Sequence, residues 1–163
     1  MKIINNKLSQ LLVFFKDQLK NKYHNDEIIA IFELVCEHFL GFTKNELKLK
    51  MNENINQSDL INIYNTCNEL KTGIPVQYVL NEAYFYNLKF YVNKFVLSPR
   101  PETEELVEIV LNYIKNNKIT SVLDIGTGTG CIPISIKKNT EKLLATRYER
   151  LMSYGKFKEA ASK

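Results

Sequence analysis

The stretch Ser121–Lys138, SVLDIGTGTGCIPISIKK, decides the fold of this chain. Its apolar start predicts a β-strand that ends at Ile125, and a helical pattern begins at about Cys131. Between the two lie three glycines at alternate positions, Gly126, Gly128 and Gly130. Glycine adopts left-handed backbone conformations and allows a ligand to approach the backbone closely. A strand, a glycine loop and a helix in this order predict the opening of a doubly wound α/β domain, which binds ligands at the carboxyl ends of its strands.

The spacing of the glycines favours a cofactor without phosphates. The loop reads G-x-G-x-G, whereas the pyrophosphate-binding fingerprint reads G-x-G-x-x-G. Asp124 precedes the first glycine by two positions, which favours a cationic or amino-bearing group close to its carboxylate. No Gly-Lys-Ser or Gly-Lys-Thr follows, so the loop is not a P-loop. A tight strand-to-helix turn that binds nothing is the alternative interpretation.

The N-terminal part of the chain reads as helix from about residue 5 to residue 74. One helical stretch, residues 26–41, spaces its apolar residues for a single buried face and ends at Gly41. Thr43 and Glu46 then form a capping-box pattern. Three or four such amphipathic helices predict a small bundle. The two histidines, His24 and His38, have no second ligand or triad partner nearby, so we expect neither a catalytic nor a metal role.

Residues 75–97 are rich in aromatic and β-branched side chains, with Asn87 and Asn93 at the expected turns. They predict a β-hairpin between two domains; an aromatic nucleic-acid platform is the alternative. Pro101 and three glutamates then predict a helix start, with a buried stripe at Leu106, Ile109, Val110 and Tyr113. Beyond Lys138 the residues predict another helix, with one face made of Leu144, Tyr148, Leu151 and Met152, and no further strand.

The fold class is therefore predicted as α/β with an N-terminal all-α bundle. We expect a helical bundle over residues 1–74, a hairpin linker over 75–97, the start of the α/β domain over 98–138, and an atypical helical tail over 139–163. With 163 residues, 45% of them hydrophobic and 25% charged, the composition is that of a soluble globular protein. No apolar run is long enough for a transmembrane helix. Three widely spaced cysteines fit reduced thiols and a cytoplasmic location.

Three segments together resemble the HemK family. They are GIPVQYVL, FYNLKFYVNKFVLSPRPETEELVE and VLDIGTGTGCIPISI, within residues 73–136. HemK proteins are S-adenosyl-L-methionine-dependent methyltransferases that modify the glutamine of the GGQ motif in peptide chain release factors. The family has an N-terminal helical bundle, a β-hairpin linker and a Rossmann-like class I methyltransferase domain. The resemblance implies a release factor as protein partner, gripped by the bundle, with no membrane or direct nucleic-acid contact and a monomeric protein.

The resemblance also implies which residues bind the cofactor. The loop residues would line its methionine and ribose side, and Asp124 would lie beneath its amino group; the set is Asp124, Gly126, Thr127, Gly128, Thr129 and Gly130. Arg100 and Thr103 resemble residues near the methionine end and are further candidate contacts. Methyl transfer is an in-line displacement in which positioning supplies much of the rate. We therefore expect no nucleophilic side chain and no metal site.

The chain departs from the family after Lys138. The family's second acidic strand end and its Asn-Pro-Pro-Tyr motif, which holds the glutamine amide, are both absent from the sequence. We therefore expect a truncated, frameshifted or fused gene product, an incomplete methyltransferase domain, no catalytic residues, and weak or absent cofactor binding without turnover. A helical protein-binding module and a nucleic-acid adenine methyltransferase are the alternative functions.

Overall fold

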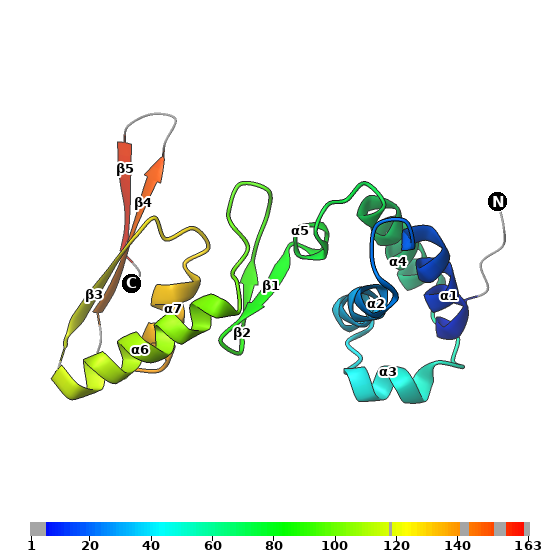
Figure 1. Ribbon diagram of the computed structural model, residues 1–163, viewed down its shortest axis with the longest axis horizontal. Coiled ribbons are helices and arrows are strands. Elements are labelled where there is room, and N and C mark those ends of the chain that lie inside the picture. The colour runs from blue at the N-terminus through cyan, green and yellow to red at the C-terminus, as the bar shows by residue number, and fades with distance from the viewer. Residues whose placement is uncertain (1–5, 118, 141–143, 152–155, 162–163) are drawn as a thin grey trace. The chain divides into compact units, whose positions relative to one another are not determined.

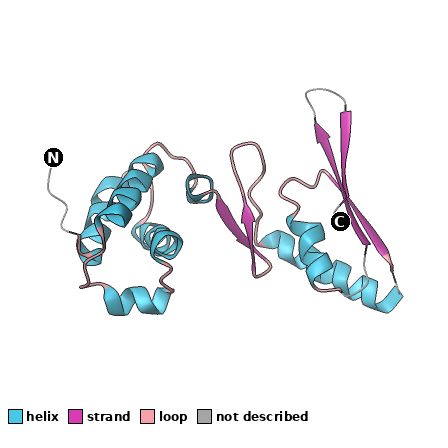
Figure 2. Cartoon of the chain, turned by 180° about the vertical axis from the view of Figure 1, so that it is seen from behind, coloured by secondary structure: helices cyan, strands magenta, loops and turns pink. Residues whose placement is uncertain are grey.

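The computed structural model describes residues 6–117, 119–140, 144–151 and 156–161, and it divides the chain into two compact units (Figure 1). The first unit, Met1–Leu80, is made of helices, and the second, Asn81–Lys163, combines helices and strands (Figure 2). No helix in the described part of the chain is long and apolar enough to cross a membrane.

Five helices form the first unit: α1 (Leu8–Leu19), α2 (Asn25–Leu40), α3 (Lys44–Lys50), α4 (Gln57–Leu70) and α5 (Val76–Leu80). Helix α2 ends as predicted, because Gly41 adopts a left-handed φ of 68° and donates its N–H to the carbonyl of Glu37. The capping box before α3 is also confirmed. Thr43 Oγ1 accepts from the Glu46 N–H, and the Glu46 carboxylate accepts from the Thr43 N–H at 2.9 Å. The expected N-terminal helical bundle is therefore present.

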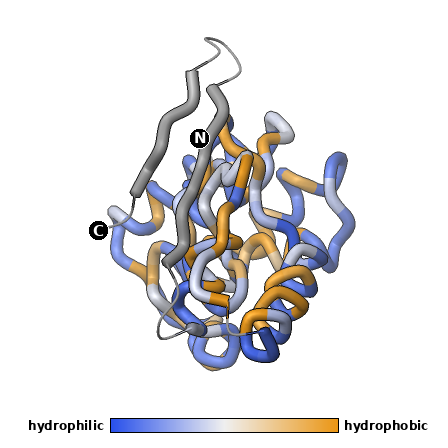
Figure 3. The backbone as a smooth tube through the Cα atoms, turned by 90° about the vertical axis from the view of Figure 1, so that its left-hand side faces the viewer, coloured by the Kyte–Doolittle hydropathy of each residue, from blue (hydrophilic) through white to orange (hydrophobic). Residues whose placement is uncertain are grey.

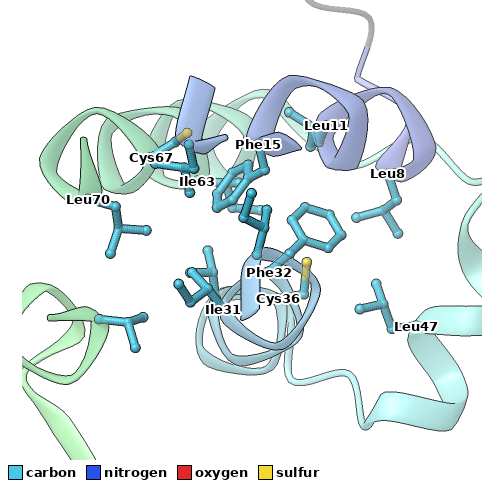
Figure 4. Packing of buried hydrophobic residues seen from close by; sticks show 14 of the residues in the cluster. Leu8, Leu11, Phe15, Ile31, Phe32, Cys36, Leu47, Ile63, Cys67 and Leu70 are labelled. Carbon is cyan, nitrogen blue, oxygen red and sulfur yellow. The ribbon is translucent and has the colours of Figure 1, made fainter. Parts of the chain in front are cut away.

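The bundle closes around one hydrophobic core to which all five helices contribute (Figure 4). At its centre the rings of Phe15 and Phe32 meet edge to face, with centroids 5.1 Å apart. Cys36 and Cys67 are fully buried in this core as free thiols, as their positions on apolar helix faces predict. This core is continuous and is built from apolar side chains. We therefore expect unit 1 to fold as an independently stable domain.

The strand-type prediction for residues 75–97 is wrong at its start. Residues 76–80 form helix α5, whose Val76 and Leu80 are buried in the core of the bundle. These side chains lie four positions apart, so a single helical turn directs both to the same side. Tertiary packing therefore outweighs the β-propensity of this short segment.

The β-hairpin itself is confirmed. Strands β1 (Glu82–Phe85) and β2 (Leu88–Tyr91) pair antiparallel, with Phe85 opposite Leu88. The two-residue turn places Tyr86 at φ 50° and Asn87 at φ 58°. Left-handed backbone at both central positions matches the right-handed twist of paired strands. Along the strands, burial alternates, so that one face of the hairpin contributes the buried side chains Ala83, Phe85 and Phe90.

Unit 2 continues with α6 (Glu102–Asn117), β3 (Ser121–Ile125) and α7 (Cys131–Lys138). A second core joins the hairpin, α6 and α7 through the buried side chains Phe85, Phe90, Val107, Ile114, Cys131 and Ile136. Hydrophobic and hydrophilic residues alternate along the helices of the chain (Figure 3). The predicted buried stripe of α6 is wrong in part: Leu106, Ile109 and Tyr113 are 46%, 65% and 61% exposed. Helix α6 is apolar on two faces, and it is the face with Val107 and Ile114 that packs against the second core.

The predicted helical tail is also wrong. Residues Leu144–Leu151 and Lys156–Ala161 form strands β4 and β5, in a sheet of order β3-β4-β5. Strand β4 pairs parallel with β3 from Ser121↔Leu144 to Ile125↔Tyr148, and β5 pairs antiparallel with β4. Unpaired backbone groups along β3 need hydrogen-bond partners, and satisfying them outweighs the helical spacing of the tail residues. Met152, the last residue of the predicted helical face, lies outside the described residues.

Candidate cofactor site at the glycine loop

The glycine loop makes a tight turn between β3 and α7. Gly126, Gly128 and Gly130 all have left-handed φ angles, of 79°, 54° and 75°. The Gly130 N–H donates to the Thr127 carbonyl at 2.8 Å, which closes the turn, and the Gly130 carbonyl accepts from the Ile134 N–H of α7. Residues that have a Cβ atom rarely adopt these φ angles. The alternate glycines are therefore required by the backbone path of the loop.

Open space lies next to the two exposed glycines. A Cβ built on Gly126 or on Gly128 meets no atom within 4 Å. Both glycines are exposed, whereas Gly130 is buried where α7 begins. The protein itself therefore does not crowd the loop, and a ligand has direct access to its backbone.

Two buried oxygens of the site have no hydrogen-bond partner among the described residues. They are Asp124 Oδ2, at the end of β3, and Thr127 Oγ1, in the loop. A buried oxygen without a donor costs about 1 to 3 kcal/mol, so native structures pair nearly all such atoms with protein, water or ligand. Their position beside the open glycines fits a ligand that donates hydrogen bonds. An ammonium group in contact with Asp124 meets that requirement.

Helix α7 begins directly after the loop, at Cys131. The N–H groups of its first residues, Cys131 and Ile132, have no carbonyl in a preceding helical turn to accept their hydrogen bonds, and Pro133 has no N–H. The Cys131 side chain is buried and packs in the same core as Phe85, Phe90 and Val107. The loop is therefore held by a core that includes residues of the β-hairpin.

Of the predicted contacts, Thr103 lies in the first turn of α6, and Arg100 precedes that helix by two residues. Arg100 is exposed, and its backbone carbonyl accepts from the Thr103 N–H at 3.0 Å. Neither side chain makes a hydrogen bond or an ion pair with another described residue. Contact of Arg100 and Thr103 with a cofactor therefore stays a prediction.

Sequence reasoning missed the glutamates that bind the hairpin. Glu104 Oε1 accepts from the Tyr86 N–H at 2.7 Å, and Glu108 Oε1 accepts from the Tyr86 hydroxyl at 2.6 Å. The hydrogen bond to Glu108 raises the pKa of Tyr86 above its ordinary value. The spacing of the glutamates, four residues apart on one helix face, was the available signal, since like charges at that spacing repel unless donors lie between them.

Comparison with known proteins agrees with the resemblance seen in the sequence. Residues 10–80 match the family described as the PrmC N-terminal domain. The release factor glutamine methyltransferase of Flavobacterium psychrophilum is 39% identical over 130 residues, which cover 77% of this chain and 45% of that protein. The resemblance to release factor glutamine methyltransferases is confirmed.

Two further relatives with the same name show the extent of the match. The protein of Enterococcus faecalis is 42% identical over 97 residues, covering 60% of this chain and 35% of its own length. That of Bacteroides thetaiotaomicron is 31% identical over 132 residues, covering 81% of this chain and 47% of its own length. The chain therefore spans less than half the length of the curated relatives that it matches.

Proposed function

We propose that this chain belongs to an S-adenosyl-L-methionine-dependent methyltransferase that modifies the glutamine of the GGQ motif in peptide chain release factors. The unpartnered Asp124 Oδ2 beside two open, left-handed glycines supports this proposal most directly. The names of these relatives support the release factor as substrate. We further propose that α6, β3, the glycine loop and α7 are the start of a Rossmann-like class I domain.

The residues of the loop would hold the cofactor rather than act on the substrate. Asp124 accepts hydrogen bonds from the amino group, and its charge favours the cationic ligand. Gly126 and Gly128 leave room for the ligand against the backbone, and Thr127 offers a hydroxyl. When bound, S-adenosylmethionine supplies an activated methyl group, so the task of the protein is to position the acceptor in line with it.

Titration of the 163-residue polypeptide with S-adenosylmethionine, followed by amide NMR, tests the cofactor site. We expect weak binding that shifts the amide signals of Gly126, Gly128 and Gly130. Asp124→Asn should abolish these shifts because it removes the negative charge, whereas Asp59→Asn, in the first unit, should leave them unchanged. Shifts that avoid the loop, or that survive in Asp124→Asn, would contradict the site.

We propose that these 163 residues do not catalyse methyl transfer by themselves. The sequence has no Asn-Pro-Pro-Tyr motif to hold the glutamine amide. A methylation assay with a release factor as substrate checks this directly, with a full-length relative as the positive control. Measurable methyl transfer by this polypeptide would show that other residues hold the glutamine.

The structure of the helical unit favours a second function, that of a protein-binding module. Its core is continuous, and helices α1 and α2 border a surface groove of about 530 Å³. The groove combines apolar side chains with charged ones: Val13, Lys16, Asp17, Lys20, Tyr23, His24, Asn25 and Ile28 line it. We propose that this unit grips the release factor, and that it does so in a monomeric, cytoplasmic protein that does not bind nucleic acid directly.

A capture experiment separates the two functions. Residues 1–80 alone should retain a release factor as well as the whole chain does if the helical unit supplies the binding surface. Lys16→Glu should weaken capture because it reverses a charge inside the groove, whereas Lys48→Glu, on α3 and outside the groove, is the matched control. Equal capture by both variants would exclude the groove as the contact surface.

A further inference from the structure

Two carboxylates on α6 hold the turn of the β-hairpin. The backbone N–H of Tyr86 donates to Glu104 at 2.7 Å, and the hydroxyl of the same residue donates to Glu108 at 2.6 Å. Glu104 and Glu108 are four residues apart, so they lie on the same face of the helix. One turn residue thus bridges both carboxylates, through its main chain and its side chain.

These contacts are stronger than ordinary surface hydrogen bonds. Each has an ionised acceptor, which makes a hydrogen bond shorter and about twice as strong as a neutral pair. The Tyr86 N–H also lies inside a two-residue turn, where Phe85 and Leu88 form the last pair of the ladder. The Tyr86 N–H therefore takes its hydrogen-bond acceptor from Glu104 of α6.

The hairpin in turn shares a hydrophobic core with the start of α7. Phe85, which directly precedes Tyr86, is 1% exposed and lies in one core with Phe90, Val107 and Cys131. The rings of Phe85 and Phe90 meet edge to face at 6.3 Å. Cys131 follows Gly130, the last residue of the glycine loop. A continuous path of packed residues therefore runs from the turn of the hairpin to the loop.

We propose that Glu104 and Glu108 clamp the hairpin onto α6, and that Glu104 is thereby a positioning residue for the glycine loop and not itself a cofactor ligand. The clamp sets the position of Phe85 in the core, and the core sets the position of the first turn of α7. The part of this proposal that concerns cofactor affinity rests on the proposed function. The mechanical part, from Glu104 to the loop, does not need a cofactor.

Amide exchange and NMR on the whole chain test the clamp. Glu104→Ala should accelerate exchange of the Tyr86 N–H about tenfold, since it removes a charge-assisted hydrogen bond, and should shift the amide signals of Gly126, Gly128 and Gly130. Glu104→Gln keeps an oxygen that accepts from Tyr86 and should restore most of both properties. Glu105→Ala is the matched control, because Glu105 lies in the same helical turn and is exposed.

The outcomes separate the two proposals. Tyr86 exchange that is equal in Glu104→Ala and Glu105→Ala overturns the clamp, and faster exchange without any shift at the glycines overturns its link to the loop. If Glu104→Ala fails to fold, Glu104→Asp, which shortens the side chain and draws the carboxylate away from the Tyr86 N–H, takes its place, and faster Tyr86 exchange with unchanged glycine signals in that variant also overturns the link. If the glycine signals respond but the wild-type chain shows no cofactor binding, the clamp stands and the proposed cofactor site fails.

Discussion

At the scale of single residues, the glycine loop offers a direct comparison with a glycine elsewhere in the chain. Gly128 and Gly41 have similar left-handed φ angles, of 54° and 68°, and neither has an atom within 4 Å of an added Cβ. Alanine at either position should therefore cost about 1 to 2 kcal/mol of backbone strain. Only Gly128→Ala should also lose the cofactor-induced shifts of the loop amides. Equal cofactor responses in both variants would place the ligand elsewhere.

Substitution of Ser135 should stabilise the protein, in contrast to the glycine substitutions. Its side chain is fully buried on α7, and its hydroxyl has no hydrogen-bond partner among the described residues. Removing an unsatisfied polar group from a core avoids a desolvation cost of about 1 to 3 kcal/mol. Ser135→Ala should therefore make α7 more stable, seen as slower amide exchange along the helix. Faster exchange would mean that the hydroxyl has a partner in solution.

The left-handed backbone of the glycine loop was predictable from the sequence. The positive φ angles of Gly126, Gly128 and Gly130 follow from their alternate spacing, because few other residues tolerate that backbone path. The burial of Thr127 Oγ1 and the contacts of Glu104 could not be predicted. Both depend on which surfaces of distant elements meet, and local sequence does not determine that.

At the scale of elements, the start of α3 depends on its capping box. The hydrogen bonds from Thr43 lower the pKa of Glu46 below its ordinary value. The resulting stabilisation is present above the unfolded pKa of about 4.3 and is lost as the pH falls through the lower folded value. Thr43→Ala should destabilise the bundle by about 1 kcal/mol and should reduce this acid dependence, because the backbone N–H that donates to Glu46 remains. Urea unfolding followed by circular dichroism at neutral and acidic pH checks both effects.

Elements with strong local signals were predicted correctly, and those that depend on partners were not. Helix α2 has both a regular apolar face and a glycine stop, and the hairpin has an asparagine at its turn. The tail has a helical spacing of apolar residues, yet its backbone pairs with β3 as strand β4. Residues 76–80 form a helix because Val76 and Leu80 reach the bundle core together. In both cases a distant element decides between two conformations that the local sequence allows.

At the scale of the whole molecule, the two thiols of the bundle report on its unfolding. Burial raises the pKa of Cys36 and of Cys67 to about 12, whereas an accessible thiol ionises near pH 8.5. Because the folded values are the higher ones, the bundle loses stability as the pH rises from about 8.5 towards about 12. Thiol reagents should label both cysteines only as fast as the bundle opens. Rapid labelling under native conditions would contradict the buried core.

The exposed apolar residues of the second unit have a consequence for handling the protein in cells and in the test tube. Leu123 and Ile125 on β3 are 53% and 72% exposed, and Ile109 on α6 is 65% exposed. Such surfaces recruit chaperones and fluorescent hydrophobic dyes. We expect the 163-residue polypeptide to bind such a dye and to gain solubility when Ile125 is replaced by lysine. The same replacement at Val13, which is 60% exposed on the helical unit, should change both properties less, and an equal change would mean that the apolar surface of the helical unit contributes as much.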